Sequence, residues 1–165
     1  MAYRKANKVV AVEELAAIVA HLKREGKRVV FTNGCFDLIH VGHTRYLEAA
    51  RGKGDCLVVA VNSDRSVSRI KGMQRPIVAL AERMEIVAGF QFIDYVTSFD
   101  DPDPYRIIEA LKPNVLVKGG DWSIDRIVGK EIVEADGGKI LTIPVIEGRS
   151  TSSIIEKIAT IYRAR

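Results

Sequence analysis

Apolar residues in this chain follow two spacings, one typical of helices and one typical of buried strands. Leu15, Ile18, Val19 and Leu22 recur at the period of an amphipathic helix, whereas residues 57–61 are continuously apolar. Such a run predicts a strand buried on both faces, as in a parallel sheet. The same patterns predict helices over 12–25, 44–51, 80–92, 105–111, 127–135 and 150–163. They predict strands over 28–32, 57–61, 95–97, 115–117 and 139–143.

The order of these elements predicts the fold class. Strands that alternate with helices of about ten residues indicate βαβ units with right-handed crossovers. We therefore expect an α/β fold, a Rossmann-like three-layer sandwich around a five-stranded parallel sheet. A length of 165 residues suits a single domain, 1–165, with an N-terminal helix at about 12–25 and a core at about 28–158. The polar and basic stretch 66–75 predicts a loop or a short helical turn.

Charge and composition favour a small anionic ligand. Lys and Arg number 25 against 21 Asp and Glu, so the formal net charge is +4. The basic residues are dispersed and form no aromatic-interleaved basic face, so we expect no nucleic-acid partner. No apolar stretch approaches the roughly 18 residues that suggest a membrane span, and no signal-peptide pattern occurs. We therefore expect no membrane partner.

The two cysteines, Cys35 and Cys56, show no dense spacing and no CxxC pattern. This usage suits a reduced protein and predicts a cytoplasmic location. Cys35 is interpreted as a small residue packed under a loop rather than as a reactive thiol.

The segment 32–43 is the most informative part of the sequence. It reads Thr-Asn-Gly-Cys-Phe-Asp-Leu-Ile-His-Val-Gly-His, follows a predicted strand and directly precedes a predicted helix. Ligands of parallel sheets bind beyond the carboxyl ends of the strands. We therefore expect this segment to meet the loops 62–64 and 118–122, which also follow strands, at one edge of the sheet.

His40 and His43 are three residues apart and so share a helix face. As zinc ligands they lack a nearby third His or Cys, and a structural role is less expected for a pair flanking a glycine. As phosphate ligands, both imidazoles donate hydrogen bonds near a positive helix end, and Gly42 admits a phosphate without a Cβ. We favour the phosphate interpretation. The GxGxxG and GxxxxGK[ST] fingerprints are missing, which argues against nicotinamide hydride transfer and P-loop phosphoryl transfer.

The 32–37 turn and the His40-Val41-Gly42-His43 signature resemble those of the HxGH nucleotidyltransferase superfamily. The full motif set is similar to one family within it, the adenylyltransferases for D-glycero-β-D-manno-heptose 1-phosphate. The further motifs are Lys71-Gly72, Arg75-Pro76, the Lys-Gly-Gly-Asp-Trp loop 118–122 and the Ser-Thr-Ser-Ser segment 150–153. The resemblance runs from about residue 28 to about residue 158. Ser152 stands where the family commonly has a second Thr, and the hydroxyl is retained.

The resemblance implies an enzyme that transfers AMP from ATP to the sugar 1-phosphate, giving ADP-heptose and pyrophosphate for lipopolysaccharide or another surface glycan. It implies Mg²⁺ held mainly by the triphosphate, with no protein side-chain ligand, and it allows a homodimer. Bifunctional relatives carry a sugar kinase before this domain, so a separate heptose kinase, with a phosphatase, is expected here. Two alternatives stay open: a CTP-dependent enzyme for glycerol 3-phosphate or a similar phosphorylated alcohol, and a non-catalytic nucleotide-binding sensor.

The candidate site residues fall into three groups. Those assigned to catalysis are His40, His43 and Lys71. Those assigned to the nucleotide are Thr32, Asn33, Gly34, Phe36, Gly42, Arg75, Arg83, Lys118, Gly119, Asp121, Arg149, Ser150, Thr151 and Ser152. Those assigned to the acceptor substrate are Asp37, Asn62, Asp64 and Trp122.

Several assignments have a structural alternative. Lys71, Arg75 and Arg149 are interpreted as triphosphate contacts rather than as solvated surface cations. Arg83 resembles a superfamily arginine near the phosphates, and an ion pair on a helix surface explains it equally well. Asp37 contacts the acceptor or orients the turn, or else it caps the following helix.

Two further assignments also have a structural alternative. Trp122 is assigned to stacking on a base or sugar in preference to a place in the core. Ser150 is compatible with both phosphate binding and ordinary helix capping.

Overall fold

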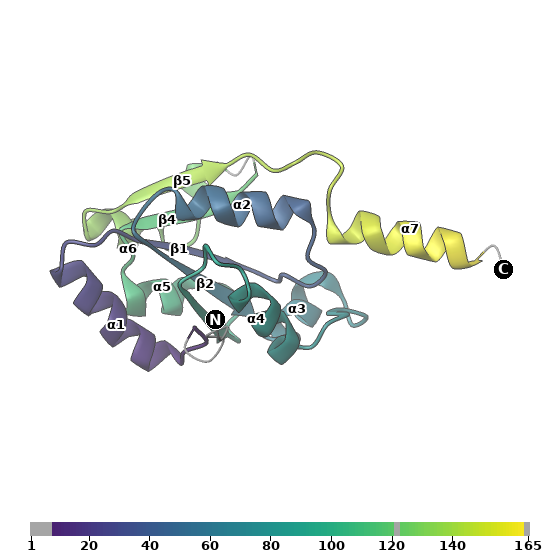
Figure 1. The fold of residues 1–165 in the computed structure, drawn as a ribbon, viewed down its shortest axis with the longest axis horizontal. Coiled ribbons are helices and arrows are strands. Elements are labelled where there is room, and N and C mark those ends of the chain that lie inside the picture. The colour runs from purple at the N-terminus through teal and green to yellow at the C-terminus, as the bar shows by residue number, and fades with distance from the viewer. Residues whose placement is uncertain (1–7, 121–122, 164–165) are drawn as a thin grey trace.

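The computed structural model describes residues 8–120 and 123–163 (Figure 1). The elements, in chain order, are α1 (Val12–Arg24), β1 (Val29–Gly34), α2 (Val41–Arg51), β2 (Cys56–Asn62), α3 (Asp64–Lys71), α4 (Leu80–Ala88), β3 (Tyr95–Phe99), α5 (Tyr105–Leu111), β4 (Val115–Gly119), the 3₁₀ turn η1 (Ile124–Arg126), α6 (Lys130–Ala135), β5 (Lys139–Ile143) and α7 (Thr151–Arg163).

The five strands form one parallel sheet in the order β3-β2-β1-β4-β5. The chain runs outward from β1 to β3, then crosses back and runs outward through β4 to β5. The direction of winding therefore reverses between β1 and β4. In open α/β sheets such a switch point opens a crevice at the carboxyl ends of the two central strands.

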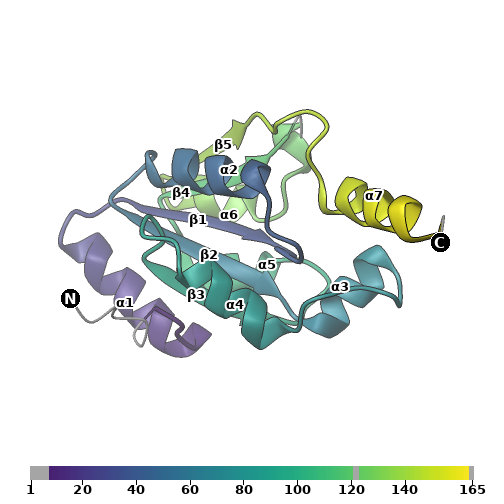
Figure 2. The same cartoon turned by 45° about the vertical axis from the view of Figure 1, so that its right-hand side comes forward.

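Helices cover both faces of the sheet, as expected for a three-layer sandwich (Figure 2). On one face, residues of α1, α5 and α6 pack on alternate strand residues such as Phe31 and Val58. On the other face, Leu47 of α2 and Val87 of α4 pack on the intervening residues, including Val30 and Val59. All seven residues of β2 are buried, which confirms the two-sided burial predicted from its apolar run.

Most sequence-based boundaries differ from the structure by a few residues, and three of the differences have identifiable causes. Residues 64–71 form the helix α3 because the Ser63 hydroxyl accepts a hydrogen bond from the Ser66 N–H at 3.0 Å, which caps the helix. The helix predicted over 80–92 ends at Ala88, before Gly89. The helix predicted from 127 begins only at Lys130, after Gly129 with its positive φ of 83°.

The last helix, α7, extends away from the rest of the molecule in both ribbon views (Figures 1 and 2). None of its residues is buried. Within the described ranges, no helix has the length and apolar character needed to cross a membrane.

Candidate active site

A cavity of about 560 Å³ lies at the carboxyl ends of the strands, where β1 and β4 meet. Most of the residues selected from the sequence line it. They are Asn33, Gly34, Phe36, Asp37, His40, Gly42, His43, Asn62, Lys71, Arg75, Lys118, Gly119, Arg149, Ser150, Thr151 and Ser152. Thr32, Asp64 and Arg83 do not line it. The candidates Asp121 and Trp122 lie outside the described residues.

The turn between β1 and α2 is shaped by Phe36. Its φ of 46° lies in the left-handed region, a conformation that costs a bulky residue on the order of 1 kcal/mol. The Phe36 ring folds back over Gly34, where an added Cβ would lie 3.0 Å from the ring atom Cε2. The same ring meets His43 edge-on, with 5.5 Å between the ring centroids. The Phe36 ring, which lies over Gly34, is therefore the surface against which His43 packs.

His40 and His43 cap the helix on which they lie. The Gly42 N–H donates to His40 Nδ1 at 3.1 Å, and the His40 N–H donates to His43 Nδ1 at 3.4 Å. A neutral imidazole whose Nδ1 accepts a hydrogen bond carries its proton on Nε2. The two rings stack with centroids 3.9 Å apart, and both residues line the cavity. Their Nε2–H groups therefore act as a pair of neighbouring hydrogen-bond donors.

The glycine at position 42 has a structural role beside the expected approach of a phosphate. An added Cβ would lie 2.9 Å from His40 Nδ1 and Cε1, closer than real Cβ atoms approach. Gly42 therefore admits the imidazole of His40, which needs this space to cap the helix.

Both histidines are held in the neutral state. Burial, together with the neighbouring His40, lowers the pKa of His43 to about 4. Burial and the charge of Arg149 also lower the pKa of His40. At neutral pH the ligand-free site therefore offers two uncharged N–H donors rather than two cations.

Asp37 is buried and organises the segment that follows α3. It accepts hydrogen bonds from Arg75 Nε at 2.6 Å and from the Ile77 and Val78 N–H groups at 2.9 Å. Burial alone raises the pKa of a carboxyl, but these hydrogen bonds hold the pKa of Asp37 below its ordinary value. Of the sequence-based options, orienting the turn matches these contacts, and helix capping is performed by His40 instead.

Arg83, which the sequence assigned to the nucleotide, lies outside the cavity lining and makes structural contacts. Its side chain is fully buried and donates to the carbonyl oxygens of Val78 (2.9 Å), Asn62 (2.8 Å) and Cys35. It also forms an ion pair with Asp64 at 2.8 Å. Arg83 therefore connects the three segments that contain Cys35, Asn62 and Val78, and Asp64 serves as its counter-ion.

Thr32 acts through a neighbour rather than through the cavity. It is fully buried, and its hydroxyl lies 2.7 Å from the Tyr46 hydroxyl, which donates to the Val117 carbonyl at 3.2 Å. Tyr46, which was not among the candidate site residues, also lines the cavity. These bonds join α2 to β1 and β4, the two strands at the switch point.

The cavity lining is rich in cations. Lys71, Arg75, Lys118, Arg126 and Arg149 all contribute to it. Of these, only Arg75 forms an ion pair within the described ranges, with Asp37. Lys118 Nζ donates to the neutral amide oxygen of Asn33, and burial lowers the pKa of Lys118 to about 8. An uncompensated positive lining of this kind favours an anionic ligand with several charges.

Sequence reasoning missed part of this lining. Asp103 lies in the loop after β3, and Val145 and Ile146 lie in the segment after β5. The rule that ligands bind beyond the carboxyl ends of strands could have found all three. Arg126, in η1, has no comparable signal in the sequence.

The described residues contain no group of three His, Cys, Asp or Glu side chains arranged to hold a metal ion. The Nδ1 atoms of His40 and His43 already accept backbone hydrogen bonds. In the described part of the site, the histidine pair is therefore built for hydrogen-bond donation.

The fold and site together define an α/β protein with a cation-lined cavity between the first strand and a histidine-capped helix. Comparison with known families agrees: residues 31–157 match the model of the cytidylyltransferase-like family, and the chain belongs to that family. The resemblance to nucleotidyltransferases noted from the motifs is thereby confirmed.

Curated relatives are similar over most of this chain. The bifunctional protein HldE of Geotalea uraniireducens is 54% identical over 153 residues, which are 93% of this chain and 31% of that protein. HldE of Geobacter sulfurreducens is 52% identical over 155 residues, 94% of this chain and 32% of that protein. The chain thus spans about a third of the length of these relatives.

Solved structures share the fold. Pantoate-β-alanine ligase from Francisella tularensis matches with a TM-score of 0.62 and 16% identity, over 96% of this chain and 78% of that chain. A lipopolysaccharide core biosynthesis protein from Thermoplasma volcanium matches with a TM-score of 0.59 and 24% identity, over 75% of this chain and 100% of that one. Both share the α/β fold expected from the sequence.

Replacing Arg83 tests its structural role. We expect Arg83→Met to lower the free energy of unfolding by about 3 kcal/mol, because one buried carbonyl group, two partly buried ones and the Asp64 carboxylate lose their donor. Urea denaturation measures this, with Arg45→Met on the exposed face of α2 as the control. Wild-type stability combined with lost binding of a nucleoside triphosphate would contradict the assignment.

His43 predicts a pH-dependent contribution to stability. Its pKa is about 4 in the folded state, below the ordinary value of 6.5, so between these values the unfolded state binds the proton first. The free energy of unfolding therefore falls as pH drops from about 6.5 towards 4.

Urea denaturation at pH 7 and at pH 5 measures this fall. We expect it to be smaller for His43→Asn, whose amide oxygen can still accept the His40 N–H. Equal pH dependence of variant and wild type would show that His43 is not held neutral by the fold.

Proposed function

We propose that this chain transfers AMP from ATP to D-glycero-β-D-manno-heptose 1-phosphate, releasing pyrophosphate and forming ADP-heptose. The observation that carries the proposal is the pair of neutral His40 and His43 Nε2–H donors in a cation-lined cavity. The acceptor is proposed from the motif set and from the strong similarity to HldE proteins.

The chemistry needs no protein nucleophile. A phosphate oxygen of the sugar 1-phosphate attacks the α-phosphorus of ATP, a new P–O bond forms, and the bond from the α-phosphorus to the bridging oxygen breaks. The acceptor oxygen is already anionic, so no proton has to be removed. Catalysis then consists of positioning and of stabilising negative charge on the phosphoryl oxygens and on the departing pyrophosphate.

The residues of the site divide this task. His40 and His43 donate from Nε2 to oxygens around the α/β bridge, where charge develops. Lys71 and Arg149 lie in the same cavity and neutralise the outer phosphates. Ser150, Thr151 and Ser152 add hydroxyl groups and backbone N–H groups at the start of α7.

Mg²⁺ fits this donor set only as an ion carried largely by the triphosphate. The carboxylates in the described cavity lining are Asp37, whose oxygens are engaged by Arg75 and two N–H groups, and Asp103. When bound, the ion supplies positive charge that neutralises the phosphate oxygens.

The substrate and product imply neighbouring reactions. A kinase and a phosphatase must prepare the sugar 1-phosphate, and the ADP-heptose serves a transferase that builds a surface glycan such as lipopolysaccharide. Because the similar HldE proteins are described as bifunctional, a kinase on a separate chain stays a prediction. We place the reaction in the cytoplasm, where ATP is available and where the free thiols of Cys35 and Cys56 stay reduced.

The two ends of the cavity suit different parts of the substrates. On the β4–β5 side, Val145 and Ile146 offer apolar surface next to Gly119, which suits a purine ring. On the β2–β3 side, Asn62 and Asp103 offer polar groups, which suit sugar hydroxyls. We therefore assign the nucleotide to the first side and the acceptor sugar to the second.

A pyrophosphate-release assay tests the function. ATP and CTP are each combined with heptose 1-phosphate and with glycerol 3-phosphate, and we expect release only with ATP and heptose 1-phosphate. Release only with CTP and glycerol 3-phosphate would favour a cytidylyltransferase. Tight ATP binding without release in any combination would favour a nucleotide sensor.

His43→Ala is the catalytic control in the same assay. Removing a donor to the transition state is expected to lower kcat by roughly a hundredfold or more. A loss of thermal stability that accounts for the whole loss of activity would instead indicate a structural role.

Asp103 tests the placement of the sugar. Asp103→Asn keeps an oxygen that can accept from the Tyr105 N–H, the bond that Asp103 now makes at 2.8 Å. We expect the KM for the sugar phosphate to rise roughly tenfold, the value of one charged hydrogen bond, with the KM for ATP unchanged.

Asp101→Asn is the matched control, because Asp101 pairs with Arg106 at 3.7 Å and does not line the cavity. An equal rise in the KM for ATP, or a changed Mg²⁺ requirement, would place Asp103 with the nucleotide instead.

A further inference from the structure

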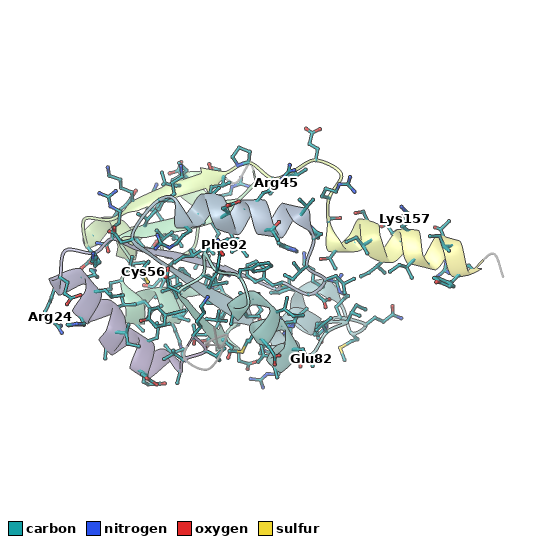
Figure 3. The ribbon with its side chains drawn as sticks, viewed as in Figure 1. Arg24, Arg45, Cys56, Glu82, Phe92 and Lys157 are labelled. Atoms are coloured by element: carbon teal, nitrogen blue, oxygen red, sulfur yellow. The ribbon has the colours of Figure 1, made fainter. Side chains whose placement is uncertain are left out.

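Asn62 is a polar residue that the fold holds in the wall of the cavity. Strand β2 runs from Cys56, which is labelled in Figure 3, to Asn62. Asn62 is only 4% exposed, yet it lines the cavity. Its backbone carbonyl accepts a hydrogen bond from Arg83 Nη2 at 2.8 Å. Asn62 therefore has a fixed place, and the group that it can offer to a ligand is its side-chain amide.

The hydrogen bonds of Ser66 determine which way this amide points. The Ser66 hydroxyl oxygen lies 3.3 Å from the Asp101 carbonyl oxygen and 3.0 Å from the Asn62 amide group. A carbonyl oxygen can only accept, and a hydroxyl has a single proton, so the Ser66 proton goes to Asp101. The Ser66 oxygen must then accept from Asn62. The end of the amide that faces Ser66 is therefore the NH₂ group.

The other end of the amide, Asn62 Oδ1, is available to a ligand. It has no hydrogen-bond partner in the described part of the chain. Every buried side-chain nitrogen or oxygen among the described residues does have one, so Oδ1 is reached by solvent although the residue is buried. Because Asn62 lines the cavity, this solvent lies there. The amide thus presents one hydrogen-bond acceptor to the cavity.

A second acceptor lies on the same side of the site. Asp101, which accepts from Ser66, begins the loop that brings Asp103 into the cavity lining. Asn62 Oδ1 and the Asp103 carboxylate are both acceptors, so they match groups that can donate. A hydroxyl can donate, whereas an ionised phosphate offers only acceptor oxygens. This part of the wall therefore suits the hydroxyls of a ligand rather than its phosphate.

We propose that Asn62 Oδ1 accepts a hydrogen bond from a hydroxyl group of the acceptor substrate, and that Ser66 is a positioning residue that holds the amide in the required orientation. The inference rests on the proposed function, which makes the acceptor a phosphorylated sugar bound on the β2–β3 side. It adds the atom that reads one sugar hydroxyl and the residue that fixes this atom. Ser66 itself is 1% exposed and does not line the cavity, so it acts only through Asn62.

The proposal makes the site selective for an acceptor that carries a hydroxyl at this point. A ligand that lacks the hydroxyl displaces solvent from Asn62 Oδ1 and leaves the oxygen unpaired. Binding sites discriminate most strongly between analogues under this condition. Without Ser66 the amide is free to rotate and to present its NH₂ group to the cavity in place of the oxygen. Loss of Ser66 therefore weakens the selectivity.

Monodeoxy analogues of the sugar 1-phosphate test the hydrogen bond. In the pyrophosphate-release assay with ATP, we expect one analogue to lower kcat/KM of the wild type at least roughly tenfold. In Asn62→Ala the same analogue is expected to cause no further loss, because its partner is already absent. Circular dichroism checks that the variant folds. If each analogue loses as much in Asn62→Ala as in the wild type, the hydroxyl is read elsewhere and the proposal is wrong.

Ser66→Ala tests the positioning role with the same analogues. We expect the preference for the natural acceptor over the critical analogue to fall at least roughly threefold, because either end of the amide can then face the cavity. Ser98→Ala is the matched control, since it removes a hydroxyl from β3 at a residue that does not line the cavity. A purely structural role of Ser66 would lower stability but leave this preference unchanged, and that result would refute the positioning role.

Calorimetric titration of the sugar phosphate and its analogues into the ATP-bound protein separates this inference from the proposed function. We expect the analogue that binds more weakly to the wild type to bind as well as the natural acceptor to Asn62→Ala. That pattern without pyrophosphate release would refute the transfer reaction and still support the hydrogen bond. Pyrophosphate release without any such difference between the two proteins would support the reaction and overturn the inference.

Discussion

The site depends on how the first turn of α2 satisfies its backbone N–H groups. Such groups have no partner within a helix and are usually capped by a Ser, Thr, Asp or Asn side chain. Here the Nδ1 atoms of His40 and His43 accept two backbone N–H groups at the start of this helix. Because the caps are imidazoles, the same hydrogen bonds fix the tautomer and orient both Nε2–H donors. The groups that are available to a phosphate are thus a consequence of helix capping.

A second constraint is the balance of charge around these donors. Burial keeps both imidazoles neutral, so the positive character of the cavity comes from Lys and Arg side chains. Asp37 compensates Arg75, and Asp64 compensates Arg83. Lys71, Lys118 and Arg149 have no such counter-ion among the described residues. Gathering like charges in one cavity costs free energy, and an arriving phosphate chain offsets that cost more than a single anion would.

Two of the predicted elements agree with the structure at both ends. The helix 105–111 and the strand 139–143 have the predicted limits, since each is a short apolar pattern bounded by clear turn residues. The gathering of the loops at one sheet edge also followed from the alternation of strands and helices. Arg83 could not be placed in this way, because its burial depends on carbonyl groups from three separate segments. Gly42 was expected to let a phosphate approach, and the close packing of His40 against it could not be foreseen from sequence spacing.

The two ends of helix α7 have different surroundings, since its first residues line the cavity and its later turns are exposed. Its first residues, beginning at Thr151, line the cavity, and they need backbone N–H groups and hydroxyls but no apolar surface. Its remaining turns carry the apolar residues Ile155, Ile158 and Ile161, which phosphate binding does not explain. A short helix is marginal in water by itself and is stabilised mainly by packing of its apolar face. The first turn has a contact of its own, because the Thr151 hydroxyl donates to the Leu38 carbonyl at 3.2 Å and so joins the start of α7 to the loop before α2.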